Sequence, residues 1–94
     1  MLNKEITNMK TFNDLQFKSH PNMNGVQARI QFENGYGASV VKAEYTYGGE
    51  DGLYELAVLD SNGDLTYSTP VTSDVEGYLS EDDVTKLLEQ IQNL

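Results

Sequence analysis

The end of the chain has apolar residues at the spacing of a single helix face. They are Val84, Leu87, Leu88, Ile91 and Leu94, with polar residues between them. This spacing predicts an amphipathic helix over residues 80–94 whose apolar face is buried. Ser80 is a favourable first residue for a helix, and Asp83 stands three positions later. We therefore expect a capping box at the start of this helix.

The middle of the chain follows a period of two, which is typical of strands. We expect four strands, over residues 26–33, 38–47, 53–60 and 65–69. Asn34-Gly35 is a strong hairpin signal, because both residues tolerate a positive φ. All the connections are too short for parallel pairing. The predicted fold is therefore α+β, a four-stranded antiparallel β-meander with the C-terminal helix packed on the sheet.

The same alternation predicts where individual side chains point. In residues 38–47 it places Tyr45 and Tyr47 on one face with Val41 and Ala43. Residues 53–60 are apolar on both faces, which predicts a strand covered on both sides. In residues 71–79 we expect Ser73 to cap a single turn. The inward-facing residues of this turn would be Val75, Tyr78 and Leu79.

The first ten residues are polar and show no clear period. We expect a flexible leader over residues 1–10, with Met9 as an alternative start, and a single domain over residues 11–94. After the leader, Thr11 is expected to cap a short turn. The apolar residues Phe12, Leu15 and Phe17 should pin this segment to the core.

The acidic residues are unevenly distributed in a chain with a net charge of −9. Residues 1–42 hold five basic and three acidic side chains, whereas residues 43–94 hold twelve acidic side chains and only Lys86. Direct binding to nucleic acid draws on Lys and Arg, so we do not expect it here. A basic protein surface is the favoured partner. Acidity also serves solubility alone, and that alternative stays open.

Several chemistries find little support. The chain has no cysteine and a single histidine, His20, with no nucleophile motif beside it. Asp60, Asn62 and Asp64 alternate like the start of a calcium loop, but the required glycine and the final glutamate are missing. The apolar runs are too short to cross a bilayer, and the amino end lacks a secretory signal. We expect no enzymatic activity, cofactor, metal site or membrane association.

The strongest candidate site combines carboxylates with tyrosines. Tyrosine is a frequent interface anchor, and charged residues form the rim of many interfaces. The alternative is that most of the six tyrosines fill the sheet core, with the hydroxyl group at its edge. The expected partner-binding carboxylates are Glu50, Asp51, Asp74, Glu76, Glu81, Asp82, Asp83 and Glu89.

Four segments resemble small acidic proteins encoded by tailed bacteriophages. They are NGYGASVV (34–41), GLYELAVL (52–59), DLTYSTP (64–70) and VEGYL (75–79). The resemblance extends over about residues 12–90. It implies a phage origin and the host-cell cytoplasm. These motifs are turns and strand cores, so it implies no activity and no site residues.

Together these features predict a non-enzymatic binding protein, a phage accessory factor that engages a basic surface of a host protein. The most specific version of this hypothesis is an inhibitor that mimics nucleic acid. The alternative is a structural or assembly protein that self-associates through a sheet edge or a tyrosine face. We expect a monomer or a small homo-oligomer.

Overall fold

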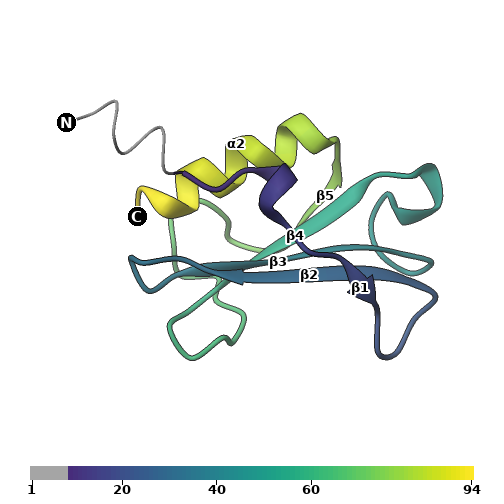
Figure 1. Ribbon diagram of the computed structural model, residues 1–94, viewed down its shortest axis with the longest axis horizontal. Coiled ribbons are helices and arrows are strands. Elements are labelled where there is room, and N and C mark those ends of the chain that lie inside the picture. The colour runs from purple at the N-terminus through teal and green to yellow at the C-terminus, as the bar shows by residue number, and fades with distance from the viewer. Residues whose placement is uncertain (1–8) are drawn as a thin grey trace.

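The computed structural model describes residues 9–94, which form one antiparallel sheet with a helix on one side (Figure 1). The expected leader falls mostly in residues 1–8, outside the described part. The strands are β1 (Lys18–Ser19), β2 (Gly25–Gln31), β3 (Gly37–Ala43), β4 (Tyr54–Leu59) and β5 (Glu76–Leu79). The helix is α2 (Glu81–Gln92), and two 3₁₀ turns span Phe12–Asp14 and Gly49–Asp51.

The α+β class and the antiparallel meander are confirmed, with the strands in the order β1-β2-β3-β4-β5. The strand count of four was wrong, because the sheet has five strands. At the β2–β3 hairpin, Gly35 adopts a φ of 94°, as the Asn34-Gly35 signal predicts. The Asn34 side chain accepts a hydrogen bond from the Tyr36 N–H at 3.0 Å.

The predicted strand over residues 65–69 is reduced to one bridge between Leu65 and Leu59. The outer edge of β4 explains this difference. Leu65 and Thr66 lie along its end, where the Thr66 N–H donates to the Val58 carbonyl at 2.9 Å. The chain then leaves the sheet, and β5 pairs with the other end of the same edge at Tyr54 and Leu56. The single turn expected over residues 71–79 was therefore wrong as well, because this segment ends in a strand.

The second predicted strand ends earlier than expected, at Ala43 instead of residue 47. Thr46 causes this ending by folding back on the strand. Its Oγ1 accepts from the Ala43 N–H at 3.0 Å and donates to the Ala43 carbonyl at 2.9 Å. The placement of Tyr45 and Tyr47 on one strand face with Val41 and Ala43 was wrong for this reason, because both tyrosines belong to a turn and are exposed.

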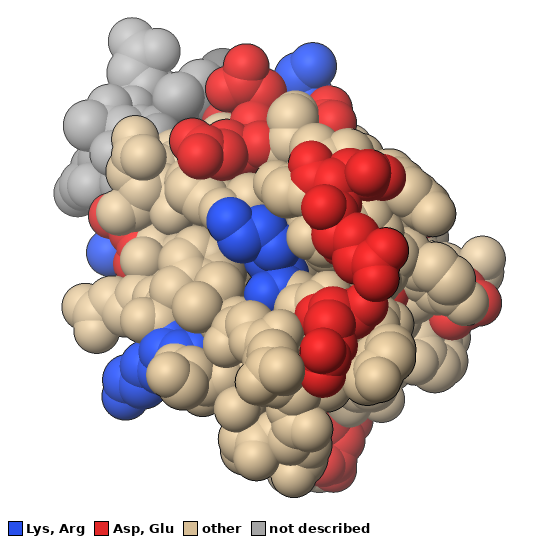
Figure 2. Space-filling model, turned by 90° about the vertical axis from the view of Figure 1, so that its right-hand side faces the viewer, with Lys and Arg blue, Asp and Glu red and all other residues tan. Residues whose placement is uncertain are grey.

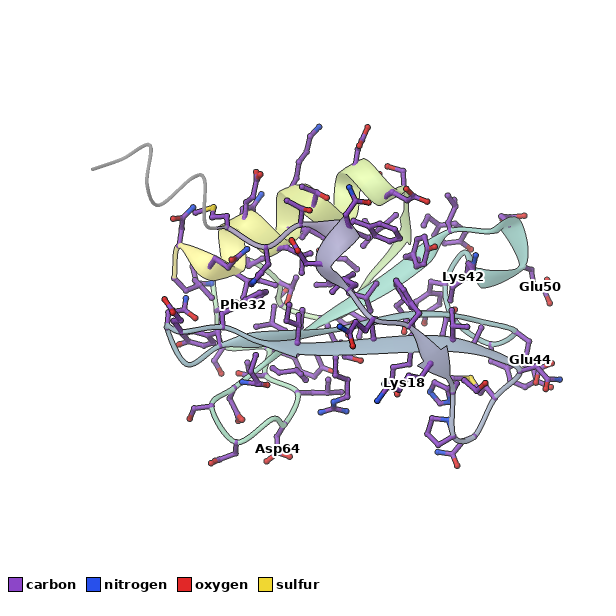
Figure 3. The ribbon with its side chains drawn as sticks, viewed as in Figure 1. Lys18, Phe32, Lys42, Glu44, Glu50 and Asp64 are labelled. Carbon is purple, nitrogen blue, oxygen red and sulfur yellow. The ribbon has the colours of Figure 1, made fainter. Side chains whose placement is uncertain are left out.

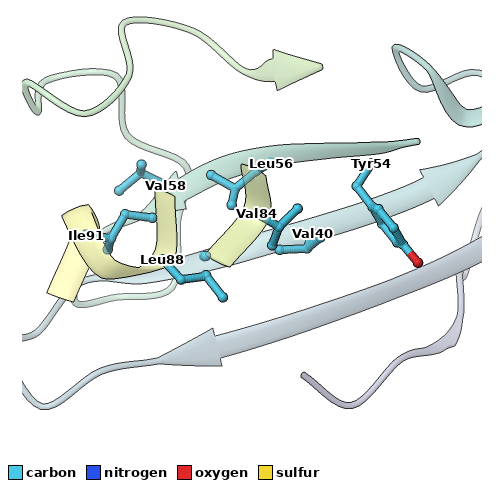
Figure 4. Close-up of a cluster of buried hydrophobic side chains, with 8 residues drawn as sticks. Val40, Tyr54, Leu56, Val58, Val84, Leu88 and Ile91 are labelled. Carbon is cyan, nitrogen blue, oxygen red and sulfur yellow. The ribbon is translucent and has the colours of Figure 1, made fainter. Parts of the chain in front are cut away.

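The core lies between α2 and the middle of the sheet (Figure 4). It is formed by Ala38, Val40, Tyr54, Leu56, Val58, Val84, Leu88 and Ile91. β4 is buried on both faces, as predicted, because the β4–β5 connection covers the face away from α2 (Figure 1). That connection is held by Arg29, which donates to the Gly63 carbonyl, and by Gln31, which donates to the Asp60 carbonyl.

Helix α2 begins with the expected capping box. The Ser80 Oγ accepts from the Asp83 N–H, and the Asp83 carboxylate accepts from the Ser80 N–H, both at 3.1 Å. At the other end, the Asn34 amide donates to the Ile91 carbonyl at 2.8 Å and so ties the β2–β3 hairpin to the helix. The predicted burial of Leu94 was wrong, because this residue lies past the helix end and is exposed.

The segment before β1 packs on the core as predicted. The Phe12 ring lies 5.1 Å from the Tyr54 ring and 5.6 Å from the Phe17 ring, measured between centroids. Leu15 also packs against the core cluster. Lys10, within the expected leader, exchanges two hydrogen bonds with the Gln92 side chain, at 2.8 and 2.9 Å. The N-terminal segment is therefore fastened to the C-terminal helix.

We predict that Leu88→Ala lowers the free energy of unfolding by about 2–5 kcal/mol, the usual cost of truncating a buried leucine. Leu88 is fully buried between α2 and the sheet. Urea unfolding followed by circular dichroism measures the change. Gln90→Ala, on the exposed side of the same helix turn, is the control and should change stability little. Equal stability of the two variants would contradict the packing described here.

Candidate functional site

The eight predicted carboxylate residues are all exposed, but the structure does not gather them into one site. Glu50 and Asp51 lie together on the 3₁₀ turn Gly49–Asp51. Glu81, Asp82 and Asp83 form the first turn of α2. Asp74 lies in the β4–β5 connection, and Glu76 begins β5. Glu89 stands apart, about 12 Å along the helix axis from Glu81 at 1.5 Å per residue.

Two of these carboxylates have structural roles. Asp74 accepts a hydrogen bond from the Val75 N–H at 2.7 Å. Asp83 closes the capping box of α2. The hydrogen bond from the Ser80 N–H, together with that from the Ser80 side chain, holds the pKa of the Asp83 carboxyl below its ordinary value of 3.8, and Lys86 adds an attraction. Asp83 therefore serves the helix start.

An open cleft of about 230 Å³ lies at the end of the sheet where β3 leads into the 3₁₀ turn. It is lined by Glu44, Tyr45, Thr46, Gly48, Glu50, Asp51 and Tyr78. We call this the acidic cleft. Two of the predicted site residues, Glu50 and Asp51, lie in it. Glu44, Tyr45 and Tyr78 join them from the β3 exit and from β5.

Three tyrosines stand out of the surface around the acidic cleft, and we call them the tyrosine face. The exposed fractions of these residues are 82% for Tyr45, 60% for Tyr47 and 62% for Tyr78. The inward placement of Tyr78 was wrong. Of the six tyrosines, Tyr54 alone is fully part of the core, while Tyr36 is half-buried against it. The expectation that most tyrosines fill the core is therefore wrong.

Short-range contacts hold the tyrosine face in place. The Tyr78 N–H donates to the Tyr47 carbonyl at 3.0 Å, which joins β5 to the turn after β3. Gly77 allows this approach, because a Cβ there would lie 2.3 Å from the Tyr47 Cβ. The Glu55 carboxylate accepts from the Tyr47 N–H at 2.9 Å. The three rings therefore project from a hydrogen-bonded framework.

Charge is separated on this end of the molecule. Figure 2 shows a run of Asp and Glu side chains along one side, with Lys and Arg side chains next to it. In Figure 3, Glu44 and Glu50 both point outward at this end, whereas Asp64 lies on the far side of the sheet from α2. Lys42 lies with its Nζ 5.2 Å from the Tyr54 ring centroid. The acidic cleft itself has no basic residue among those that line it in residues 9–94.

The other candidates from the sequence have structural explanations. The His20 Nδ1 accepts from the N–H groups of Asn22 and Met23, at 3.0 and 3.1 Å, and so orders its own loop. The Asp60 Oδ1 accepts from the N–H groups of Asn62 and Asp64, which makes this segment a tight turn. Residues 9–94 contain no group of three His, Asp or Glu side chains arranged to hold a metal. Nor do they contain a helix that is long and apolar enough to cross a membrane.

Comparison of the chain with protein-family models, with curated proteins and with solved structures found no match. The resemblance to small phage proteins therefore stays a prediction. The geometry of the tyrosine face and the acidic cleft is what bears on function.

We predict that Asp83→Asn destabilises the protein at neutral pH and that this loss shrinks in acid. The pKa of Asp83 is lowered in the folded state, so its carboxylate stabilises the fold fully above the ordinary value of 3.8. That contribution disappears as the pH falls through the lowered folded pKa. Urea unfolding of wild type and variant at pH 7 and at successively lower pH measures it. Asp82→Asn, in the same helix turn, is the control, and an equal effect of both variants would contradict a specific role of Asp83.

Proposed function

We propose that this protein is a small non-enzymatic binding protein that docks on a basic surface of another protein. The observation that carries this proposal is the tyrosine face beside the acidic cleft. Tyrosine offers a large, rigid contact area with little loss of side-chain entropy, and it is enriched at the energetic centres of interfaces. The carboxylates around it favour a partner of opposite charge.

Three features favour a protein partner over a small ligand or a nucleic acid. The acidic cleft, at about 230 Å³, is smaller than the roughly 300–1,000 Å³ of most small-molecule sites. The three tyrosines project from the surface, so one broad surface of a partner can contact all of them at the same time. Finally, residues 43–94 repel phosphate backbones through their excess of twelve acidic side chains over one basic one.

From the resemblance of residues 12–90 to small phage proteins, we further propose that the partner is a protein of the bacterial host, met in its cytoplasm. A nucleic-acid-binding surface fits the required chemistry, because it presents Lys and Arg to the solvent. In that case the protein excludes nucleic acid by occupying the same basic surface.

We predict that host proteins captured on the immobilised chain depend on the tyrosine face and on salt. Binding should weaken steeply between about 50 and 300 mM salt, because the Debye screening length shortens to well under about 10 Å. The test variant is Glu50→Gln/Tyr78→Asn, which removes one charge and one ring from the site. Asparagine suits position 78 because it tolerates positive φ.

The control is Asp64→Asn/Tyr67→Asn, which removes the same charge and another exposed ring outside the acidic cleft. Capture that survives in the control and is lost in the test variant supports the proposal. Capture that is equal for both variants contradicts it. Adding duplex DNA to the captured partner then tests mimicry, because a shared surface requires the two to compete.

A second candidate function is self-assembly through a sheet edge, and the outer edge of β2 favours it. β1 pairs with β2 only at Val26 and Gln27. In the described part of the chain, no strand lies beside residues 28–31 on that side. An uncovered edge of this kind is a template for pairing with another copy.

If this edge mediates assembly, sedimentation velocity should find a defined oligomer that persists at high salt, because backbone hydrogen bonds are screened little. Light scattering gives its mass independently. A monomer at all accessible concentrations contradicts the assembly function and leaves docking as the sole candidate.

A further inference from the structure

Two residues of the tyrosine face also line the acidic cleft. Tyr45 and Tyr78 belong to its lining, and both residues are mostly exposed. Glu44, Glu50 and Asp51 line the same cleft. Tyrosine and acidic residues therefore line one and the same space.

The framework of the cleft is fixed by the turns that build it. The Gly49 N–H donates to the Thr46 carbonyl at 3.1 Å, and the Leu53 N–H donates to the Gly48 carbonyl at 2.9 Å. Gly48 packs against Tyr78 so closely that a Cβ on it would lie 2.9 Å from the Tyr78 Cα. These contacts order the backbone before any partner arrives, so little entropy is lost there on binding.

Tyr78 is held in an unusual conformation. Its φ is 54°, and it is the one residue other than glycine with a positive φ in residues 9–94. A bulky side chain in this region carries backbone strain. Here the residue is 62% exposed, so core packing does not account for the conformation. The strained position is the one that carries a ring to the wall of the acidic cleft.

We propose that the acidic cleft binds the guanidinium group of an arginine presented by the partner protein. This inference rests on the proposed docking function and names the chemistry of its central contact. A guanidinium is planar and cationic, so it stacks on a tyrosine ring and donates paired hydrogen bonds to a carboxylate. The cleft offers both kinds of group within one space.

Arginine fits this site better than lysine does. A lysine ammonium is a compact, strongly hydrated charge that cannot stack as a plane or form the paired bonds. The carboxylates alone attract either cation, so the rings of Tyr45 and Tyr78 are what separates the two. The tyrosine face therefore selects among basic surfaces by their arginine content.

The test titrates ¹⁵N-labelled protein with three pentapeptides of the form acetyl-Gly-Gly-X-Gly-Gly-amide. X is arginine, lysine or citrulline, the last having nearly the shape of arginine without its charge. Amide resonances of Gly48, Glu50, Asp51 and Tyr78 report on the cleft. We expect them to shift with arginine, to shift with a dissociation constant about two- to fivefold weaker with lysine, and not to shift with citrulline.

Tyr78→Asn should weaken arginine binding while the melting temperature is kept, and Tyr67→Asn should leave binding unchanged. Equal affinities for arginine and lysine overturn the inference, since the cleft then responds to charge alone. Unshifted cleft amides also overturn it. After either result, the proposed docking function still stands if capture of a host protein depends on Tyr78. If capture does not depend on Tyr78 either, the proposed function itself is contradicted.

Discussion

The packing of α2 against β3 and β4 is the contact on which the rest of the structure depends. Val84, Leu88 and Ile91 are fully buried there, against strand residues such as Val40 and Leu56. Each large buried side chain contributes about 1.5–3 kcal/mol before chain entropy is subtracted. In a chain of this length one modest core is the main source of stability. Every other element is positioned by its attachment to this core.

That attachment extends to the candidate site through short steps along the chain. The capping box fixes the start of α2 at Ser80, directly after β5 ends at Leu79. Placing the helix therefore places β5 on the edge of β4. β5 in turn holds Tyr78 against the Tyr47 carbonyl. The tyrosine face is thus rigidly connected to the core although its rings lie outside it.

Regular spacing made the central elements predictable from the sequence. β2 and α2 bury side chains at a fixed period, and β4 is buried on both faces as its nearly continuous apolar run predicts, so the pattern in the sequence and the burial in the structure agree. The same reasoning failed at Tyr45. A hydrogen bond from the Thr46 side chain to the Ala43 carbonyl ends the strand at Ala43, although the alternating pattern in the sequence continues to Tyr47. It failed again at β5, whose four residues contain an exposed tyrosine with positive φ. The acidic cleft could not be predicted either. Residues 44–51 lie beside Tyr78 only because β5 pairs with the edge of β4, and the sequence pattern did not predict that pairing.

Net charge alone is therefore a poor guide to the function of this protein. Asp83, Asp74, Asp60 and Glu55 all accept backbone hydrogen bonds, so part of the acidity serves turns and helix starts. The remaining carboxylates are compatible with solubility as well as with docking. Exposed tyrosines separate these two explanations, because aromatic rings on the surface do not improve solubility. A fold that keeps Tyr78 in a strained conformation, exposed beside two other exposed tyrosines, carries a cost that solubility does not explain and that the proposed docking would explain.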